Sequence, residues 1–97
     1  MIYTIDEIKK IATPIVREYG VNRLSLFGSY ARGEANENSD IDFYMDKGDL
    51  KGFIQYFSLV DKLEESFQCH VELITTGFSN KEFLNKIQKD EILIYER

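Results

Sequence analysis

The first hydrophobic pattern along the chain is helical and lies near its N-terminus. Apolar side chains recur there every three or four positions, at Ile5, Ile8, Ile11, Ala12, Ile15, Val16 and Tyr19. Thr4 and Glu7 can form a capping box before this run, and Gly20 follows it as a stop signal. The pattern predicts a first helix, and Pro14 inside it predicts either a kink or two consecutive short helices.

Two strand patterns follow, separated by a tight turn and a polar loop. Residues 24–27 are a short apolar run that ends at Gly28-Ser29, and residues 30–32 are suited to a brief helical turn. Residues 34–39 are polar, and residues 40–45 alternate between polar and apolar side chains. The sequence therefore predicts a strand, a tight turn with a short helix, a loop and a second strand.

An aromatic-rich stretch with helical spacing occupies the middle of the chain. Its apolar positions are Leu50, Phe53, Ile54, Phe57, Val60, Leu63 and Phe67. Charged side chains, among them Glu64 and Glu65, lie mostly on the other face. We interpret the aromatic stripe as part of the hydrophobic core rather than as a cofactor site, and the paired glutamates as solvated.

The C-terminal third predicts one more strand and one more helix. Residues 70–75 resemble a strand, and Ser79 with Glu82 forms a second capping box ahead of a short helix. The apolar end, residues 92–95, is suited either to an edge strand or to a packed tail. The order helix, strand, turn, strand, helix, strand, helix, without internal repeats, predicts an α/β or α+β layer sandwich.

Length, charge and cysteine content narrow the class of protein. The chain has 97 residues, of which 43% are hydrophobic, so residues 1–97 are expected to form a single domain. Seventeen acidic residues against twelve basic ones give a net charge of −5, which disfavours stable binding to nucleic acid. Cys69 is the only cysteine, and no long apolar run or basic leader is present. We expect a soluble, cytoplasmic protein with no membrane partner.

Two aspartates form the first candidate site for chemistry. Asp40 and Asp42 are two residues apart on a predicted strand, so both carboxylates project from one face. Such like charges are tolerated when water or a cation screens them, and a pair of magnesium ions shared with substrate phosphates is a common arrangement. By itself the spacing is weak evidence, because a solvated edge strand more often gives the same pattern.

A glycine turn forms the second candidate site. Gly28 lacks a side chain directly after the first predicted strand, so a phosphate could approach the backbone there, with the Ser29 hydroxyl as a further donor. Arg32 could add a positive charge. Either motif alone is common, and their combination at this spacing is much more specific.

Together these motifs resemble a known family signature. The stretch Leu26-Phe27-Gly28-Ser29-Tyr30-Ala31-Arg32-Gly33-Glu34-Ala35, ten residues between Ser29 and Asp40, and then Ser39-Asp40-Ile41-Asp42 are similar to the minimal nucleotidyltransferase (MNT) motif of the DNA polymerase beta superfamily. The resemblance extends from the first helix to the apolar C-terminal segment. It implies a nucleotidyltransferase fold, with a small mixed β-sheet packed against helices.

The resemblance also implies roles for individual residues. It implies that Asp40 and Asp42 bind two Mg²⁺ ions, and that a third carboxylate on an adjacent strand completes one metal site and accepts the acceptor's proton. The matching residue is Glu72, where MNT proteins more often carry aspartate. Strand alternation directs Glu72 away from its apolar neighbours, which places it on the surface of the aspartates. His70 would share that face, but we expect it to be structural.

The implied reaction transfers a nucleoside monophosphate from a nucleoside triphosphate to a hydroxyl. ATP is the donor that the resemblance implies, with Gly28, Ser29 and Arg32 at its phosphates. Stand-alone MNT proteins resemble antitoxins whose partner is a helical HEPN toxin, and adenylylation of a toxin tyrosine is the leading hypothesis. A non-catalytic antitoxin and a small-molecule nucleotidyltransferase remain alternatives. Both a hetero-oligomer with the toxin and a homodimer stay open.

Overall fold

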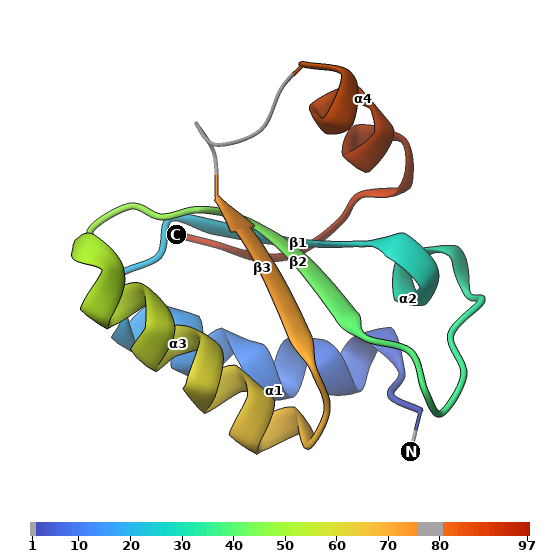
Figure 1. Ribbon diagram of the computed structural model, residues 1–97, viewed down its shortest axis with the longest axis horizontal. Helices are drawn as coiled ribbons and strands as arrows, with labels where there is room; N and C mark the ends of the chain where they lie inside the picture. The colour runs from blue at the N-terminus through green and yellow to red at the C-terminus, as the bar shows by residue number, and fades with distance from the viewer. Residues whose placement is uncertain (1, 76–80) are drawn as a thin grey trace.

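The computed structural model describes residues 2–75 and 81–97 and confirms the predicted order of elements (Figure 1). The described residues form the helices α1 (Ile5–Glu18), α2 (Gly28–Arg32), α3 (Gly52–Phe67) and α4 (Lys81–Asp90), and the strands β1 (Arg23–Phe27), β2 (Ile41–Asp46), β3 (Val71–Thr75) and β4 (Ile92–Glu96). The apolar C-terminal segment is thus a strand rather than a tail. Ser79, half of the second predicted capping box, lies outside the described residues.

The four strands form one mixed sheet in the order β3-β2-β1-β4. β1 runs antiparallel to both β2 and β4, whereas β2 and β3 are parallel and are connected through α3. Helices α1 and α3 cover one face of the sheet, and α4 lies on the other side (Figure 1). The mixed α/β sandwich that the sequence predicts is therefore confirmed.

Strand alternation separates a core face of the sheet from an open face. Leu24 and Leu26 of β1 lie opposite Met45 and Phe43 of β2, and all four side chains are fully buried beneath α1 and α3. The residues that alternate with them along β2, such as Asp42, face the opposite side. This periodicity places the acidic residues of β2 on the face that α1 and α3 leave open.

Helix α1 begins at the predicted capping box and continues through Pro14. The Thr4 hydroxyl accepts a hydrogen bond from the Glu7 amide at 3.1 Å, and the Thr4 amide donates to the Glu7 carboxylate at 2.8 Å. The helix then runs unbroken to Glu18, so the alternative of two short helices is wrong. Pro14 is exposed, which keeps its ring out of the packed layer.

The interpretation of the central aromatic stripe as core is wrong for the first half of α3. Leu63 and Phe67 are buried as expected, but Phe53, Ile54 and Phe57 are 72%, 87% and 59% exposed. At 100° per residue, the buried residues Leu59, Leu63 and Phe67 share one side of α3, whereas Ile54 and Phe57 are turned away from that side. The apolar stripe is therefore wider than the surface that the sheet and α1 cover.

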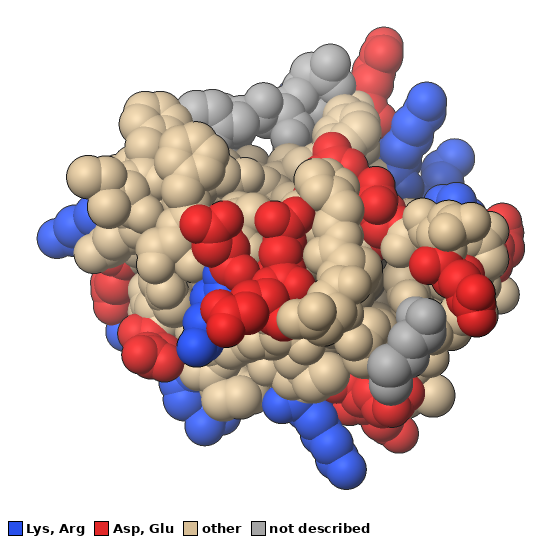
Figure 2. All heavy atoms as spheres, turned by 60° about the horizontal axis from the view of Figure 1, so that its bottom comes forward, with Lys and Arg blue, Asp and Glu red and all other residues tan. Residues whose placement is uncertain are grey.

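Charge is unevenly distributed on the surface. Figure 2 shows acidic side chains gathered near the centre of one molecular face, beside a broad uncharged area. None of the helices in the described ranges is long and apolar enough to cross a membrane.

Candidate functional site

The site begins with two carboxylates on adjacent parallel strands. Asp42 of β2 and Glu72 of β3 are register partners, and the apolar residues on either side of each are buried in the core. Both carboxylates therefore project from the open face of the sheet, as the alternation of β3 predicts for Glu72. The sequence motif contained Asp42, and the parallel register brings Glu72 beside it.

The two carboxylates interact strongly. Burial, then the charge of Glu72 and a hydrogen bond with it, and then the charge of Asp40, raise the pKa of Asp42 to about 6. A hydrogen bond between two carboxyl groups requires that one of them carries a proton. Below about pH 6 Asp42 therefore carries a proton, at a position where a hard divalent cation could replace it.

Asp40 lies one residue before β2 and is exposed. Its negative charge contributes to the raised pKa of Asp42, so the carboxylates belong to one electrostatic group. Within the described part of the chain, however, no three acidic, histidine or cysteine side chains are already arranged around a common metal position. The chemistry of the oxygen donors fits magnesium, and a third ligand would have to come from a movement of Asp40 or from substrate phosphates.

Gly28 brings the turn after β1 directly against Asp42. Its φ of +74° lies in the left-handed region, and a Cβ at this position would overlap the Asp42 carboxylate. Phe27, in extended conformation, leads into α2, and Ser29 is half-buried in its first turn. The structure therefore brings the glycine turn and the acidic pair together, as the combined motif predicts.

Arg32 lies at the end of α2 and is bound to two carboxylates. Its guanidinium pairs with Glu34 at 3.1 Å and with Asp90 at the end of α4 at 3.3 Å. The positive charge of Arg32 also lowers the pKa of Asp42, which shows that the charge is felt at the acidic pair. In this arrangement Arg32 joins the loop after α2 to α4, and a phosphate would have to compete with both carboxylates for it.

Two side chains of α3 hold the outer edge of β3, and the sequence analysis missed both. Glu64 accepts a hydrogen bond from the Val71 amide at 3.0 Å, and the Tyr56 hydroxyl donates to the Leu73 carbonyl at 2.5 Å. The expectation that Glu64 is solvated is wrong for this reason. His70 pairs with the same Glu64 carboxylate at 3.0 Å, which is a structural contact outside the acidic pair.

Neither edge contact leaves a signal in the hydrophobic pattern. Glu64 lies in a charged stretch of α3, and Tyr56 lies in the aromatic run that was interpreted as core. Their partners are backbone groups of β3, which any residue type supplies. Only the packing of α3 beside an edge strand shows that Glu72 is held from both sides.

Comparison with known proteins assigns the chain to a family. The family model for polymerase beta nucleotidyltransferases matches residues 9–97, which include both motifs and all four strands. The chain belongs to this family. The matched residues of this nucleotidyltransferase include the acidic pair and the glycine turn.

Relatives of similar length support the assignment. MJ0435 of Methanocaldococcus jannaschii, a candidate protein adenylyltransferase, is 38% identical over 89 residues, covering 92% of this chain and 90% of its own length. Protein adenylyltransferase MntA of Thermococcus cleftensis is 35% identical over 75 residues, covering 73% of this chain and 76% of its own. The nucleotidyltransferase described here is thus similar to proteins named for the transfer of adenylyl groups to protein.

A solved structure shares the fold. It contains the tri-AMPylated HEPN toxin of Shewanella oneidensis in complex with an MNT antitoxin. One of its chains matches this nucleotidyltransferase with a TM-score of 0.67 and 19% identity, covering 96% of this chain and 70% of the other. At this identity the match shows a common fold only.

Proposed function

We propose that the chain is a magnesium-dependent protein adenylyltransferase that transfers AMP from ATP to a tyrosine hydroxyl of a HEPN toxin and so acts as an antitoxin. The nucleotidyltransferase family supplies the class of reaction. The adenylyltransferase relatives and the AMPylated toxin complex support the donor and the partner.

The observation that carries the proposal is the acidic pair against the glycine turn. Asp42 and Glu72 lie side by side on the open face, Glu72 helps to raise the pKa of Asp42, and a Cβ at Gly28 would overlap the Asp42 carboxylate. A purely structural position would not require two carboxylates side by side at an energetic cost. Such perturbed groups cluster at functional sites, where the environment shifts a pKa toward the working pH.

The residues divide the work of the transfer among them. Asp40, Asp42 and Glu72 would hold the magnesium ions, which stabilise the charge on the entering and leaving oxygens. The backbone at Gly28 and the hydroxyl of Ser29 would bind the triphosphate, and Arg32 would contribute charge if phosphates displace its carboxylate partners. Glu72 would accept the proton of the attacking hydroxyl as it forms a bond to the alpha-phosphate and pyrophosphate leaves.

A second candidate is a non-catalytic antitoxin that neutralises its partner by occlusion. The glutamate at position 72, where the family more often has aspartate, favours this candidate because the longer side chain shifts the carboxylate relative to the attacking oxygen. A misplacement of this size is sufficient to reduce catalysis strongly. The intact Asp40 and Asp42 favour the enzyme.

The two candidates differ in what happens to the partner's mass. The purified chain is incubated with its cognate HEPN toxin, magnesium and each labelled nucleoside triphosphate in turn, with Asp40→Ala/Asp42→Ala as the control. We expect a metal-dependent gain of one or more AMP units at a tyrosine, absent with the control. A partner silenced equally well by both proteins, without any gain in mass, would instead establish the occluding antitoxin.

A further inference from the structure

We propose that the exposed apolar surface at the start of α3, formed by Phe53, Ile54 and Phe57 and called the α3 face below, docks an amphipathic helix of the protein acceptor. The partner helix is expected to be apolar at its centre and basic at its rim. This inference rests on the proposed function, because it names the surface that binds the acceptor protein.

The α3 face is concentrated rather than scattered. Its three residues lie within five positions of one helix, and Ile54 is 87% exposed. The rings of Phe53 and Phe57 stack on each other with centroids 6.4 Å apart, so they form one continuous surface. Single exposed apolar residues are normal on soluble proteins, but a contiguous group of large ones is typical of an interaction surface.

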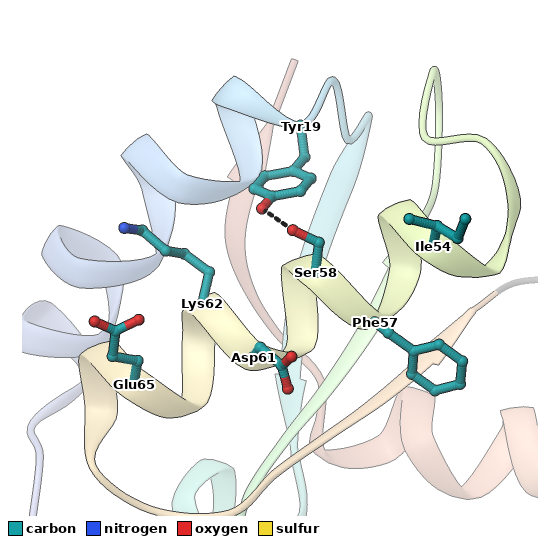
Figure 3. Close-up of a pocket in the computed structure, with 7 residues that line it drawn as sticks. All are labelled: Tyr19, Ile54, Phe57, Ser58, Asp61, Lys62 and Glu65. Atoms are coloured by element: carbon teal, nitrogen blue, oxygen red, sulfur yellow. Dashed lines mark hydrogen bonds between the residues drawn. The ribbon is translucent and has the colours of Figure 1, made fainter.

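A shallow, open groove lies beside the α3 face. It has a volume of about 520 Å³ and lies between the end of α1 and α3. Figure 3 shows Ile54, Ser58 and Lys62 along one side of α3, with Tyr19 reaching from α1 so that its hydroxyl meets that of Ser58 at 2.7 Å. Grooves with an apolar wall between two helices commonly bind the apolar face of a third.

The α3 face is continuous with the catalytic edge of the sheet. The ring of Phe57 packs against that of Tyr56 at 5.4 Å, and the Tyr56 hydroxyl donates to the carbonyl of Leu73, the residue after Glu72. Burial and then the charge of Glu72 raise the pKa of Tyr56, which shows that the two side chains are close. Phe57 therefore borders the edge strand that carries Glu72, although the Glu72 carboxylate projects from the other face of the sheet.

The charges along the groove favour a basic partner. Asp61 and Glu65 line it against one basic side chain, Lys62, and neither acid has an ion-pair partner within the described residues. Basic side chains around an apolar helix would complement this surface.

The same charges disfavour other occupants. A symmetric second copy would bring two surfaces of the same acidic sign together, in molecules that each carry a charge of −5. An anionic lipid surface and a nucleic acid would be repelled for the same reason. A protein with a basic, amphipathic helix is the occupant that fits both the shape and the charge.

The test compares surface variants of the full chain in binding and in transfer, with the cognate HEPN toxin as the probe. Ile54→Asp places a charge on the α3 face, and Ile2→Asp makes the same chemical change at an exposed position outside the helices and strands. We expect Ile54→Asp to raise the Kd for the toxin and the KM for transfer about tenfold or more, with kcat at saturating toxin unchanged. Ile2→Asp should stay within about twofold of the wild type.

A charge variant tests the basic rim separately. Asp61→Lys is expected to slow association with the toxin several-fold and to reduce its dependence on salt, because rim charges act mainly on the rate of encounter. Unchanged association and an unchanged salt dependence would overturn the basic character of the partner surface.

The remaining outcomes separate this inference from the proposed function. If Ile54→Asp binds and modifies the toxin like the wild type, the α3 face is not the docking surface and the transferase stands. If the wild type binds without transferring AMP, the transferase fails, and the affinity of Ile54→Asp still decides the docking. A wild-type dimer in sedimentation that Ile54→Asp dissociates, with toxin binding intact, would make a second copy the occupant and overturn the proposal.

Discussion

Three features of its surroundings disfavour the charged form of Asp42. It is partly buried, Glu72 is its register partner on β3, and Asp40 precedes it by two residues. Together they hold the pKa of Asp42 at about 6, well above the ordinary value of 3.8. A raised pKa means that the folded state disfavours the charged carboxylate. In the metal-free protein the charged form of Asp42 therefore lowers the free energy of unfolding.

Asp42→Asn is therefore expected to stabilise the metal-free protein while abolishing transfer. Between about pH 4 and pH 6 the folded state holds a proton that the unfolded state releases, so the stability of the wild type falls as the pH rises through this range. Asparagine removes the loss, which after solvent screening amounts to about 1 kcal/mol above pH 6. Thermal unfolding with a chelator at pH 4 and pH 7 measures the difference.

The comparison between the two pH values is the decisive part of this experiment. At pH 4 the wild type and Asp42→Asn should unfold at closely similar temperatures, and at pH 7 the variant should unfold a few degrees higher. Asp61→Asn, at an exposed position on α3, is the control and should show no such gap. A gap of equal size at both pH values would mean that the charge of Asp42 is not its origin.

Gly28 and Gly33 both have a positive φ, so variants of the two glycines distinguish the effect of backbone strain from the effect of contact with Asp42. Gly28 and Gly33 have φ angles of +74° and +73°, but a Cβ at Gly28 would overlap the Asp42 carboxylate, whereas one at Gly33 would meet nothing within 4 Å. Gly33→Ala is thus expected to cost about 1 kcal/mol from its left-handed φ and to leave transfer within a few-fold.

Gly28→Ala should have the same conformational cost and should also displace the Asp42 carboxylate. We expect a loss of transfer of about a hundredfold, because small displacements of reacting groups have effects of this size. Chemical denaturation and AMP transfer, measured on both variants, provide the check. Equal loss of transfer in the two variants would show that the close approach to Asp42 is unimportant.

At the scale of elements, β3 is an edge strand that α3 holds from outside. Glu64 binds the Val71 amide and Tyr56 binds the Leu73 carbonyl, and these backbone groups lie on either side of Glu72. An edge strand otherwise presents unpaired backbone groups and is free to shift. The two contacts fix the strand, and with it the distance from Glu72 to Asp42.

Tyr56→Phe removes one of these contacts without changing the shape of the side chain. Loss of the hydrogen bond to Leu73 is expected to cost about 1 kcal/mol in the free energy of unfolding. Because the bond also positions Glu72, we expect kcat for AMP transfer to fall about tenfold and the KM for ATP to change little. Steady-state kinetics and denaturation on the same preparation measure both effects.

Tyr19→Phe is the matched control for Tyr56→Phe. It removes a tyrosine hydroxyl that meets Ser58 at 2.7 Å, between α1 and α3 and on exposed side chains. AMP transfer at saturating acceptor should remain at the wild-type rate in this variant. If both tyrosine variants lower kcat equally, general loosening of α3 explains the effect and the positioning of Glu72 does not.

The helices and strands could be predicted from the sequence because each depends on a local pattern. The capping box at Thr4 and Glu7, the alternation in β2 and the spacing in α3 all act over a few residues. The exposure of Phe53, Ile54 and Phe57 could not be predicted, because an apolar stripe does not show which part of its width the neighbouring elements cover. The choice between strand and tail at the C-terminus also depended on a partner, since β4 exists through its pairing with β1.

The site was predictable to the extent that its parts are local. Gly28 and Asp42 belong to motifs that are readable in the chain, and the structure confirms that they touch. Glu72 came from the family resemblance and from alternation, and the parallel register of β2 and β3 then placed it beside Asp42. The contacts of Tyr56 and Glu64 are between a side chain and a backbone across elements, and no pattern along the chain encodes them.

At the scale of the whole molecule, the net negative charge and the acidic site both favour the binding of divalent cations. A net charge of −5 attracts divalent cations over the surface, and the repulsion within the acidic pair is relieved when a cation binds. Magnesium that binds only the folded state should stabilise it by mass action. With AMP-PNP present, the phosphates add ligands and the stabilisation should increase.

We therefore expect magnesium with AMP-PNP to raise the unfolding temperature of the wild type by about 10 °C at a hundredfold excess over Kd, and by less at high salt. Glu72→Gln and Asp42→Asn should lose most of this rise, since each removes a negative oxygen donor, whereas Tyr56→Phe should keep most of it. A weakly bound, non-specific ion atmosphere would instead stabilise all four proteins to the same extent, because it responds to the total charge and not to the acidic pair. Thermal scans of the four proteins at two salt concentrations decide between a built metal site and the general attraction of an acidic surface.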